Sequence, residues 1–132
     1  MKTTDIEKKA AGRLGEGLAA EYLRGLGQVI LERNWRSGHL EVDIISLADD
    51  GLHFVEVKSR KAPLSADPET AITAQKMQKI VKAAHRYLHS PDVRKLSGRR
   101  PEIFFDAVTV VIYNDTETEI NYYPRVYTPF YI

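Results

Sequence analysis

The chain has 132 residues, of which 43% are apolar, and this length and composition suit one domain with a buried core. It holds no cysteine and no apolar run near the roughly 20 residues of a membrane span, which excludes a disulfide scaffold, a thiolate metal site and a membrane-spanning helix. The net charge is only +1, yet residues 58–100 hold 11 Lys and Arg against 3 Asp and Glu, and such a basic segment is typical of a surface that binds a polyanion such as nucleic acid.

A helix is expected over residues 4–26, where apolar side chains recur at a spacing of four. Its predicted apolar face consists of Leu14, Leu18, Tyr22 and Leu26, with Ala11 and Ala19 close to the same face. Glycines at positions 12, 15 and 17 each cost roughly 1 kcal/mol inside a helix, which indicates that another backbone or a ligand approaches closely there. The N-terminus lacks the apolar stretch of a secretory signal, so we expect a cytoplasmic protein without membrane contact.

Three strands are expected next, over residues 28–35, 39–47 and 51–59, with a turn at residues 49–51. A polar, proline-bearing loop over residues 60–70 leads to a second helix over residues 73–89. The apolar stripe of that helix is predicted to be Met77, Ile80, Val81, Ala84 and Leu88. The remaining elements are a basic loop over 90–101, an apolar, central strand over 103–113 and an edge strand over 119–127. This order of elements indicates one α/β layer structure.

Acidic and basic side chains share one face of two neighbouring strands. Side chains alternate between faces along a strand, so Glu56 and Lys58 point the same way. A two-residue turn over residues 50–51 would pair Asp43 with Lys58, whereas a four-residue loop over residues 48–51 would pair Asp43 with Glu56. Both registers place Asp43, Glu56 and Lys58 on one face, and a three-residue loop would separate them.

Two carboxylates on adjacent strands form a negatively charged, oxygen-rich site. Their repulsion raises one pKa unless a cation lies between them, and a hard ion such as Mg²⁺ suits two carboxylates completed by water. Such an ion activates water and stabilises charge on a phosphate, and a lysine beside it can orient the attacking water. The set Asp43, Glu56 and Lys58 is therefore a compact apparatus for phosphodiester hydrolysis. The alternative is a charge pair on a solvated outer face of the sheet.

Six sequence blocks, in order along nearly the whole chain, resemble the YraN-like family of small bacterial proteins. The blocks are GRLGEGLAAEYL (12–23), ILERNWR (30–36), EVDII (41–45), HFVEVKSR (53–60), ETAITAQK (69–76) and FDAV (105–108). That family is similar to the PD-(D/E)XK, restriction-endonuclease-like superfamily, near the archaeal Holliday-junction resolvases. The resemblance implies one endonuclease-like domain over residues 1–132, with a three-layer α/β core. Its central mixed β-sheet is flanked by helices in the order α-β-β-β-α-β-β.

The resemblance also implies roles for single residues. Asp43 and Glu56 match metal ligands for Mg²⁺ or Mn²⁺, Lys58 matches the catalytic lysine, and Glu16 matches a glutamate near the metal. The expected function is a metal-dependent nuclease that acts on DNA, including branched or otherwise structured DNA. Two alternatives stay open: a nucleic-acid-binding protein that keeps the fold without turnover, and a partner-binding protein whose acidic face is solvated.

Contacts with nucleic acid are expected on the second helix and in the basic segment. Gln75 and Lys76 match family positions near the substrate phosphate, and Arg60, Lys79 and Lys82 belong to the basic segment. A resolvase would need two active sites and hence a homodimer, for which the tyrosine-rich tail over residues 120–132 is the candidate interface. The chain departs from the family at His39 and Leu40, where two glycines are usual, and at Phe104, where an arginine is usual.

Overall fold

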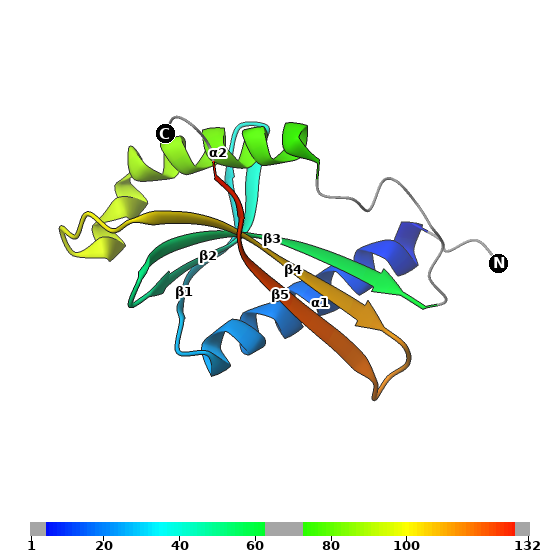
Figure 1. Ribbon diagram of the computed structural model, residues 1–132. Helices are drawn as coiled ribbons and strands as arrows, with labels where there is room; N and C mark the ends of the chain where they lie inside the picture. Colours follow the sequence, from blue (N-terminus) through cyan, green and yellow to red (C-terminus); the bar gives the residue numbers. More distant parts are fainter. Residues whose placement is uncertain (1–4, 63–72, 129–132) are drawn as a thin grey trace.

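Five strands form one mixed sheet that lies between two helices (Figure 1). The structure, a computed structural model, describes residues 5–62 and 73–128. Its elements are α1 (Asp5–Gly25), β1 (Val29–Ser37), β2 (Leu40–Ala48), β3 (Gly51–Lys61), α2 (Ala74–Leu88), the 3₁₀ helix η2 (Pro91–Leu96), β4 (Ile103–Ile112) and β5 (Thr118–Tyr127). The strand order is β1-β2-β3-β4-β5, and all neighbours are antiparallel except β3 and β4, which are parallel. The predicted three-layer α/β fold and its order of elements are confirmed.

Each face of the sheet carries its own apolar core, because side chains alternate along the strands. Phe54 of β3 packs with Tyr87 of α2 and with Phe105 of β4. The next residue of β3, Val55, belongs to the opposite core, which includes Leu23 of α1. The two helices therefore cover opposite faces of the same strand.

The apolar stripe predicted for α2 is confirmed. Met77, Ile80 and Ala84 are buried, and Val81 and Leu88 pack against the same core. The helix begins after residue 73, whose threonine side chain accepts a hydrogen bond from the backbone N–H of residue 76.

The sheet-facing side of α1 differs from the predicted one. Leu14 and Leu26 are 52% and 54% exposed, whereas Gly15, Ala19 and Leu23 are buried. The predicted face is therefore wrong at Leu14, Tyr22 and Leu26, which are exposed. It is right at Ala19, which is buried, and at Ala11 and Leu18, which pack against this core. The buried side also includes Gly15, and a residue without a side chain allows a close approach.

Gly15 is a point of direct contact between α1 and β3. A Cβ atom at Gly15 would lie 1.6 Å from Ser59 Oγ and 2.6 Å from Ser59 Cβ. We expect Gly15→Ala to lower the free energy of unfolding by about 1–3 kcal/mol, the usual cost of overpacking. Urea denaturation followed by circular dichroism measures the change as a shift of the midpoint.

Gly12→Ala is the matched control for this substitution. A Cβ atom at Gly12 would meet no atom of the described structure within 4 Å, so alanine should be neutral or stabilise the helix by up to about 1 kcal/mol. Combining Gly15→Ala with Ser59→Gly should recover most of the lost stability. Equal destabilisation by the two single alanine variants would contradict a close contact at Gly15.

The turn between β2 and β3 consists of Asp49 and Asp50, and Gly51 already belongs to β3. Ile44 pairs with Val55, which is the register predicted for the four-residue loop. The register of a turn over residues 50–51 is therefore wrong, and so is the three-residue alternative.

Two connecting segments also differ from the prediction. The predicted basic loop over residues 90–101 contains the 3₁₀ helix η2, which starts at Pro91. Proline suits a helix start because its missing N–H is not needed there. β3 continues to Lys61 and so takes up the start of the loop predicted over residues 60–70. The remainder of that loop lies outside the described residues.

The outer strands agree with the prediction in part. β5 is an edge strand as expected, and β4 has a neighbour on each side, although β3 is the middle strand. The tail proposed as a dimer interface is described only as far as Thr128, and the homodimer stays a prediction. In the described part of the chain, no helix combines the length and the apolar character needed to cross a membrane.

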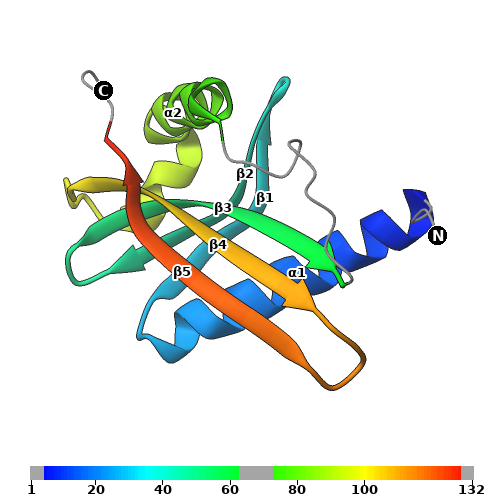
Figure 2. The ribbon, with the colours of Figure 1, turned by 45° about the vertical axis from the view of Figure 1, so that its right-hand side comes forward.

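The β1–β2 hairpin bends out of the sheet toward α2 (Figures 1 and 2). The pairing of β2 with β3 ends at Ile44 and Val55. Beyond that point Val42 packs in the α2 core, and Trp35 of β1 meets Tyr87 edge-on at 5.2 Å between ring centroids. The bend separates β2 from β3 and leaves backbone groups of β3 free for other partners.

Candidate active site

Asp43 lies where β2 separates from β3. The Ile44–Val55 register, continued by one residue, places Asp43 opposite Glu56. Asp43 Oδ2 accepts a hydrogen bond from the backbone N–H of Val57 at 2.8 Å. The carboxylate thus takes the place of a backbone acceptor in the ladder, and this bond fixes it between the two strands.

Two lysines flank Glu56, which is only 5% exposed. Lys76 Nζ, from α2, forms an ion pair with Glu56 Oε1, and Lys58 Nζ lies 3.7 Å from the same oxygen. The structure therefore gathers Asp43, Glu56, Lys58 and Lys76 beside the N-terminus of α2. We call these four residues the acidic–lysine cluster.

Burial dominates the electrostatics of the acidic–lysine cluster. Burial, and then the negative charge of Glu56, raise the pKa of Asp43 to about 8. Burial and the ammonium of Lys76 lower the pKa of Lys58, against the opposing effect of the two carboxylates. Burial disfavours the charged form of Lys76, but its hydrogen bonds to Glu56 and Lys58 and the charges of Glu56 and Asp43 together outweigh burial and raise its pKa. The cluster thus holds two close carboxylates that favour a cation between them.

Glu16 reaches the neighbourhood of the cluster from α1. Burial raises the pKa of Glu16, a hydrogen bond with Asn34 lowers it, and the charges of Glu41 and Glu56 raise it again. Glu16 is therefore near enough to Glu56 for their charges to interact. Its position follows from the close contact of Gly15 with β3, one residue earlier in the helix.

The other predicted binding residues stay outside the cluster. Gln75, Lys79 and Lys82 are exposed on α2, and Arg60 is half-buried near the end of β3. Among the residues that the structure describes, none of these four takes part in an ion pair. Lys76 differs from them, because it points into the cluster and pairs with Glu56.

The donor set of the cluster fits a hard divalent cation. Within the described part of the chain, no group of three or more His, Cys, Asp or Glu side chains is arranged to hold a metal ion. Mg²⁺, however, binds proteins through one or two carboxylates and keeps several waters, as does the similar ion Mn²⁺. Burial first, and the charge of Glu56 second, raise the pKa of Asp43, so a cation bound between the two carboxylates would stabilise the ionised form of Asp43. Lys76 already supplies positive charge on the Glu56 side.

A second buried polar cluster, which the sequence prediction missed, lies near the start of β3. His53 Nδ1 lies 2.5 Å from Asp106 Oδ2, and His53 Nε2 lies 2.7 Å from Asp50 Oδ1. Tyr122 OH and the backbone N–H of Arg125 also donate to Asp106. Burial disfavours a charged imidazole, but the two carboxylates outweigh burial and raise the pKa of His53. The available signal was the charged Asp106 inside an otherwise apolar strand.

The chain matches the family described as "Uncharacterised protein family UPF0102" over residues 15–110. It is 40% identical over 111 residues to a UPF0102 protein of Syntrophomonas wolfei, and this match covers 84% of this chain and 91% of that relative. It is also 40% identical over 110 residues to a UPF0102 protein of Chlorobium chlorochromatii, a match that covers 83% of this chain and 81% of that relative. A UPF0102 protein of Clostridium perfringens is 36% identical over 115 residues, a match that covers 86% of this chain and 90% of that relative. The chain belongs to the UPF0102 family.

UPF0102 is the YraN-like family that the sequence blocks indicated, so that prediction is confirmed. The family match includes Glu16, the whole acidic–lysine cluster and Asp106. It ends before β5, so Tyr122, the partner of Asp106, lies beyond it.

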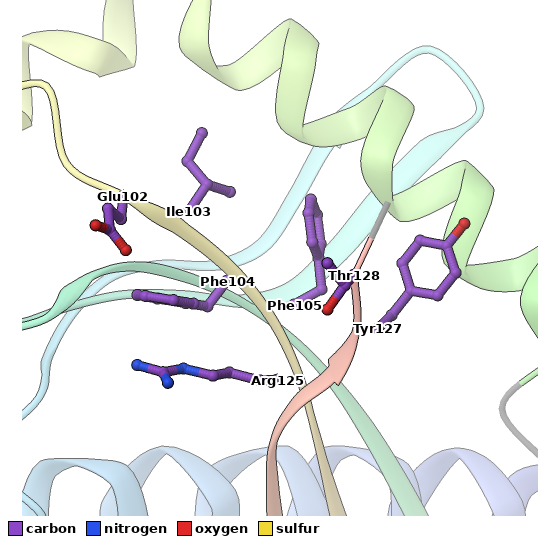
Figure 3. Close-up of a pocket in the computed structure, with 7 residues that line it drawn as sticks. All are labelled: Glu102, Ile103, Phe104, Phe105, Arg125, Tyr127 and Thr128. Carbon is purple, nitrogen blue, oxygen red and sulfur yellow. The ribbon is translucent and has the colours of Figure 1, made fainter. Parts of the chain in front are cut away.

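Figure 3 shows the side chains that line a cavity of about 230 Å³ at the start of β4. The described residues of its lining do not include a member of the acidic–lysine cluster. Phe104, where the resemblance led us to expect an arginine, lines this cavity. In this chain the guanidinium of Arg125, from β5, lies 4.5 Å from the centroid of the Phe104 ring. A positive group is thus present beside this position, although it comes from another strand.

Proposed function

We propose that this UPF0102 protein is a metal-dependent nuclease that hydrolyses phosphodiester bonds in DNA, including branched or otherwise structured DNA. One observation carries the proposal: Asp43 and Glu56, on adjacent strands, lie beside Lys58 in a largely buried cluster. Two carboxylates and a lysine in this arrangement suit metal-assisted attack of water on a phosphate.

In this proposal Asp43 and Glu56 would hold Mg²⁺ or Mn²⁺. The bound ion would supply a more acidic water and offset negative charge on the phosphate. The backbone N–H of Val57 keeps the Asp43 carboxylate in place. Lys58 orients the attacking water or neutralises charge that develops on the phosphate, because its ammonium lies 3.7 Å from Glu56 Oε1. Glu16 adds a further carboxylate near the site.

The exposed side of α2 would bind the DNA backbone. Lys79 and Lys82 are exposed and one helical turn apart, and they follow Lys76 along the same helix. We expect Lys79→Ala combined with Lys82→Ala to weaken binding and to flatten the plot of log affinity against log salt by about 0.9 for each lost phosphate contact. Fluorescence anisotropy with a labelled duplex at several salt concentrations measures this slope.

Arg13→Ala combined with Arg24→Ala is the matched control. This pair removes the same charge from exposed positions of α1, on the other face of the sheet and outside the basic segment, and it should leave the slope within experimental error of wild type. An unchanged slope in the lysine variant would show that the exposed face of α2 only solvates the protein.

The ion pair between Lys76 and Glu56 favours one alternative, a nucleic-acid-binding protein without turnover. An internal ammonium on Glu56 competes for the oxygen that a metal ligand needs. The deciding experiment incubates the purified protein with linear, single-stranded, flapped and four-way DNA in Mg²⁺ and in Mn²⁺, with Asp43→Asn alongside. Cleavage by wild type alone supports the nuclease. Binding of all four DNA forms without cleavage supports the alternative.

A further inference from the structure

A hollow of about 530 Å³ lies at the C-terminal end of α2, between η2 and the start of β4. Its floor is aliphatic and consists of Leu88, Val93, Leu96, Pro101 and Ile103. Its rim carries the exposed side chains of Arg94, Arg99 and Arg100. Among the described residues that line the hollow, none is aromatic and none is acidic. We call it the arginine-rimmed hollow.

The rim arginines keep their positive charge uncompensated. Within residues 5–62 and 73–128, none of the three forms an ion pair. Two nearby acids are engaged elsewhere: Glu32 and Asp92 pair with Lys95, and Asp92 also accepts a hydrogen bond from Trp35 Nε1. The exposed Glu102 lines the neighbouring cavity at the start of β4 and forms no ion pair with the three arginines. Arg94 Nε donates to a backbone carbonyl of η2, which leaves its terminal amino groups for a ligand. The rim is therefore a local concentration of three unpaired cations.

A tight turn sets two of these arginines on the rim. Ser97 and Gly98 have φ angles of 54° and 77°, in the left-handed region. The backbone N–H of Arg99 then donates to the carbonyl of Leu96 at 3.0 Å. The backbone thus turns back toward η2, and Arg99 and Arg100 follow at the edge of the hollow.

The hollow and the lysines that are proposed to bind DNA, Lys79 and Lys82, lie on different flanks of α2. Successive helix residues are about 100° apart, which puts Leu88 across the helix axis from Lys79 and Arg86. Arg86 donates to the carbonyl of Ser37 in β1, whereas Leu88 lines the hollow together with Ile103 of β4. The arginine-rimmed hollow is therefore a surface separate from the one that carries Lys79 and Lys82.

We propose that the arginine-rimmed hollow binds an acidic segment of a partner protein, with aliphatic side chains of that segment seated on its floor. Three unpaired arginines match several carboxylates, and arginine binds carboxylates in a forked, two-bond geometry. An aliphatic floor gains free energy from burying aliphatic side chains. A nucleic-acid base would instead be stacked on aromatic rings, which the described lining lacks. This inference does not depend on nuclease activity.

The test uses the full-length chain and fluorescence anisotropy with a labelled peptide of four aspartates followed by two leucines. We expect saturable binding with Kd of about 10–100 μM. Replacing the two leucines by serines should weaken binding about tenfold. Arg99→Glu combined with Arg100→Glu should weaken binding of the original peptide at least about tenfold, because two attractions become repulsions.

Lys79→Glu combined with Lys82→Glu is the matched control, since it changes the net charge by the same amount on the other flank of α2. It should leave peptide affinity within about twofold of wild type. Thermal melting verifies that both variants are folded. The inference is overturned if both variants lose peptide affinity equally, or if peptide binding to wild type does not saturate up to about 1 mM. It is also overturned if a six-nucleotide oligothymidine binds as tightly as the peptide and displaces it. The last result would assign the hollow to nucleic acid instead.

Discussion

Lys58→Ala should lose cleavage activity by roughly 10²–10³-fold in rate while its DNA affinity stays within about twofold of wild type. The ammonium of Lys58 lies beside Glu56 at 3.7 Å, within the cluster and away from the exposed face of α2. Its loss removes a positioned charge at the reacting phosphate and leaves the backbone contacts in place. Single-turnover cleavage of a labelled DNA, with anisotropy for affinity, separates the two effects. Cleavage that persists unchanged would assign the activity to a contaminating nuclease.

Asp43→Asn should lose metal affinity together with cleavage, which distinguishes a ligand from a charge that acts only on the phosphate. Isothermal titration with Mn²⁺ measures the affinity directly. Asparagine keeps the size of the side chain and an oxygen that can accept from the backbone N–H of Val57, so the fold should survive. Normal Mn²⁺ affinity in this variant would remove Asp43 from the metal site.

The same variant should be more stable than wild type in alkaline, metal-free buffer. The folded pKa of Asp43 is about 8, far above the value of an unfolded aspartate. A raised pKa gives stability that is present below the unfolded pKa and is lost as the pH rises through about 8. Ionised Asp43 therefore destabilises the protein at pH 9, and neutral asparagine removes that cost. A lower melting temperature of Asp43→Asn at pH 9 would contradict the buried repulsion.

Asp106→Asn is expected to lower the free energy of unfolding by about 3–5 kcal/mol, because it takes the carboxylate partner away from the buried imidazole of His53. Asp106 is fully buried and connects three strands through His53 of β3, its own strand β4, and Tyr122 of β5. Urea denaturation measures the loss. Asp50→Asn is the control: Asp50 contacts the same imidazole, but its side chain is 46% exposed, so its loss should be below about 1 kcal/mol.

The pH dependence of stability tests whether His53 is charged in the folded state. The stability that His53 contributes is present below its unfolded pKa of about 6.5. It is lost as the pH rises through the higher folded pKa, because the folded state then gives up the proton that it had retained. The difference in unfolding free energy between wild type and His53→Gln should therefore shrink from pH 6 to pH 9. Asp43 titrates in the same range but is present in both proteins, so its contribution cancels. A constant difference would indicate a neutral imidazole.

The acidic–lysine cluster was predictable in part. Strand alternation placed Glu56 and Lys58 on one face, and both predicted registers put Asp43 on that face. The structure decided that Asp43 lies opposite Glu56 and not opposite Lys58. The ion pair of Lys76 with Glu56 was not predictable, since it depends on how α2 sits over β3. The hydrogen bond from Val57 to Asp43 was equally hidden, because it requires β2 to leave the β3 ladder.

The sequence by itself determined the family, the order of helices and strands, and the buried stripe of α2. These follow from local periodicity and from sequence blocks, which need no knowledge of distant neighbours. Only the tertiary structure decided which glycine of α1 lies against the sheet, because the close contact of Gly15 depends on how the helix sits over Ser59 of β3. The same holds for the His53–Asp106 pair. Its residues are 53 positions apart in the chain, and parallel pairing of β3 with β4 brings them together, so their charges compensate only after the sheet has formed.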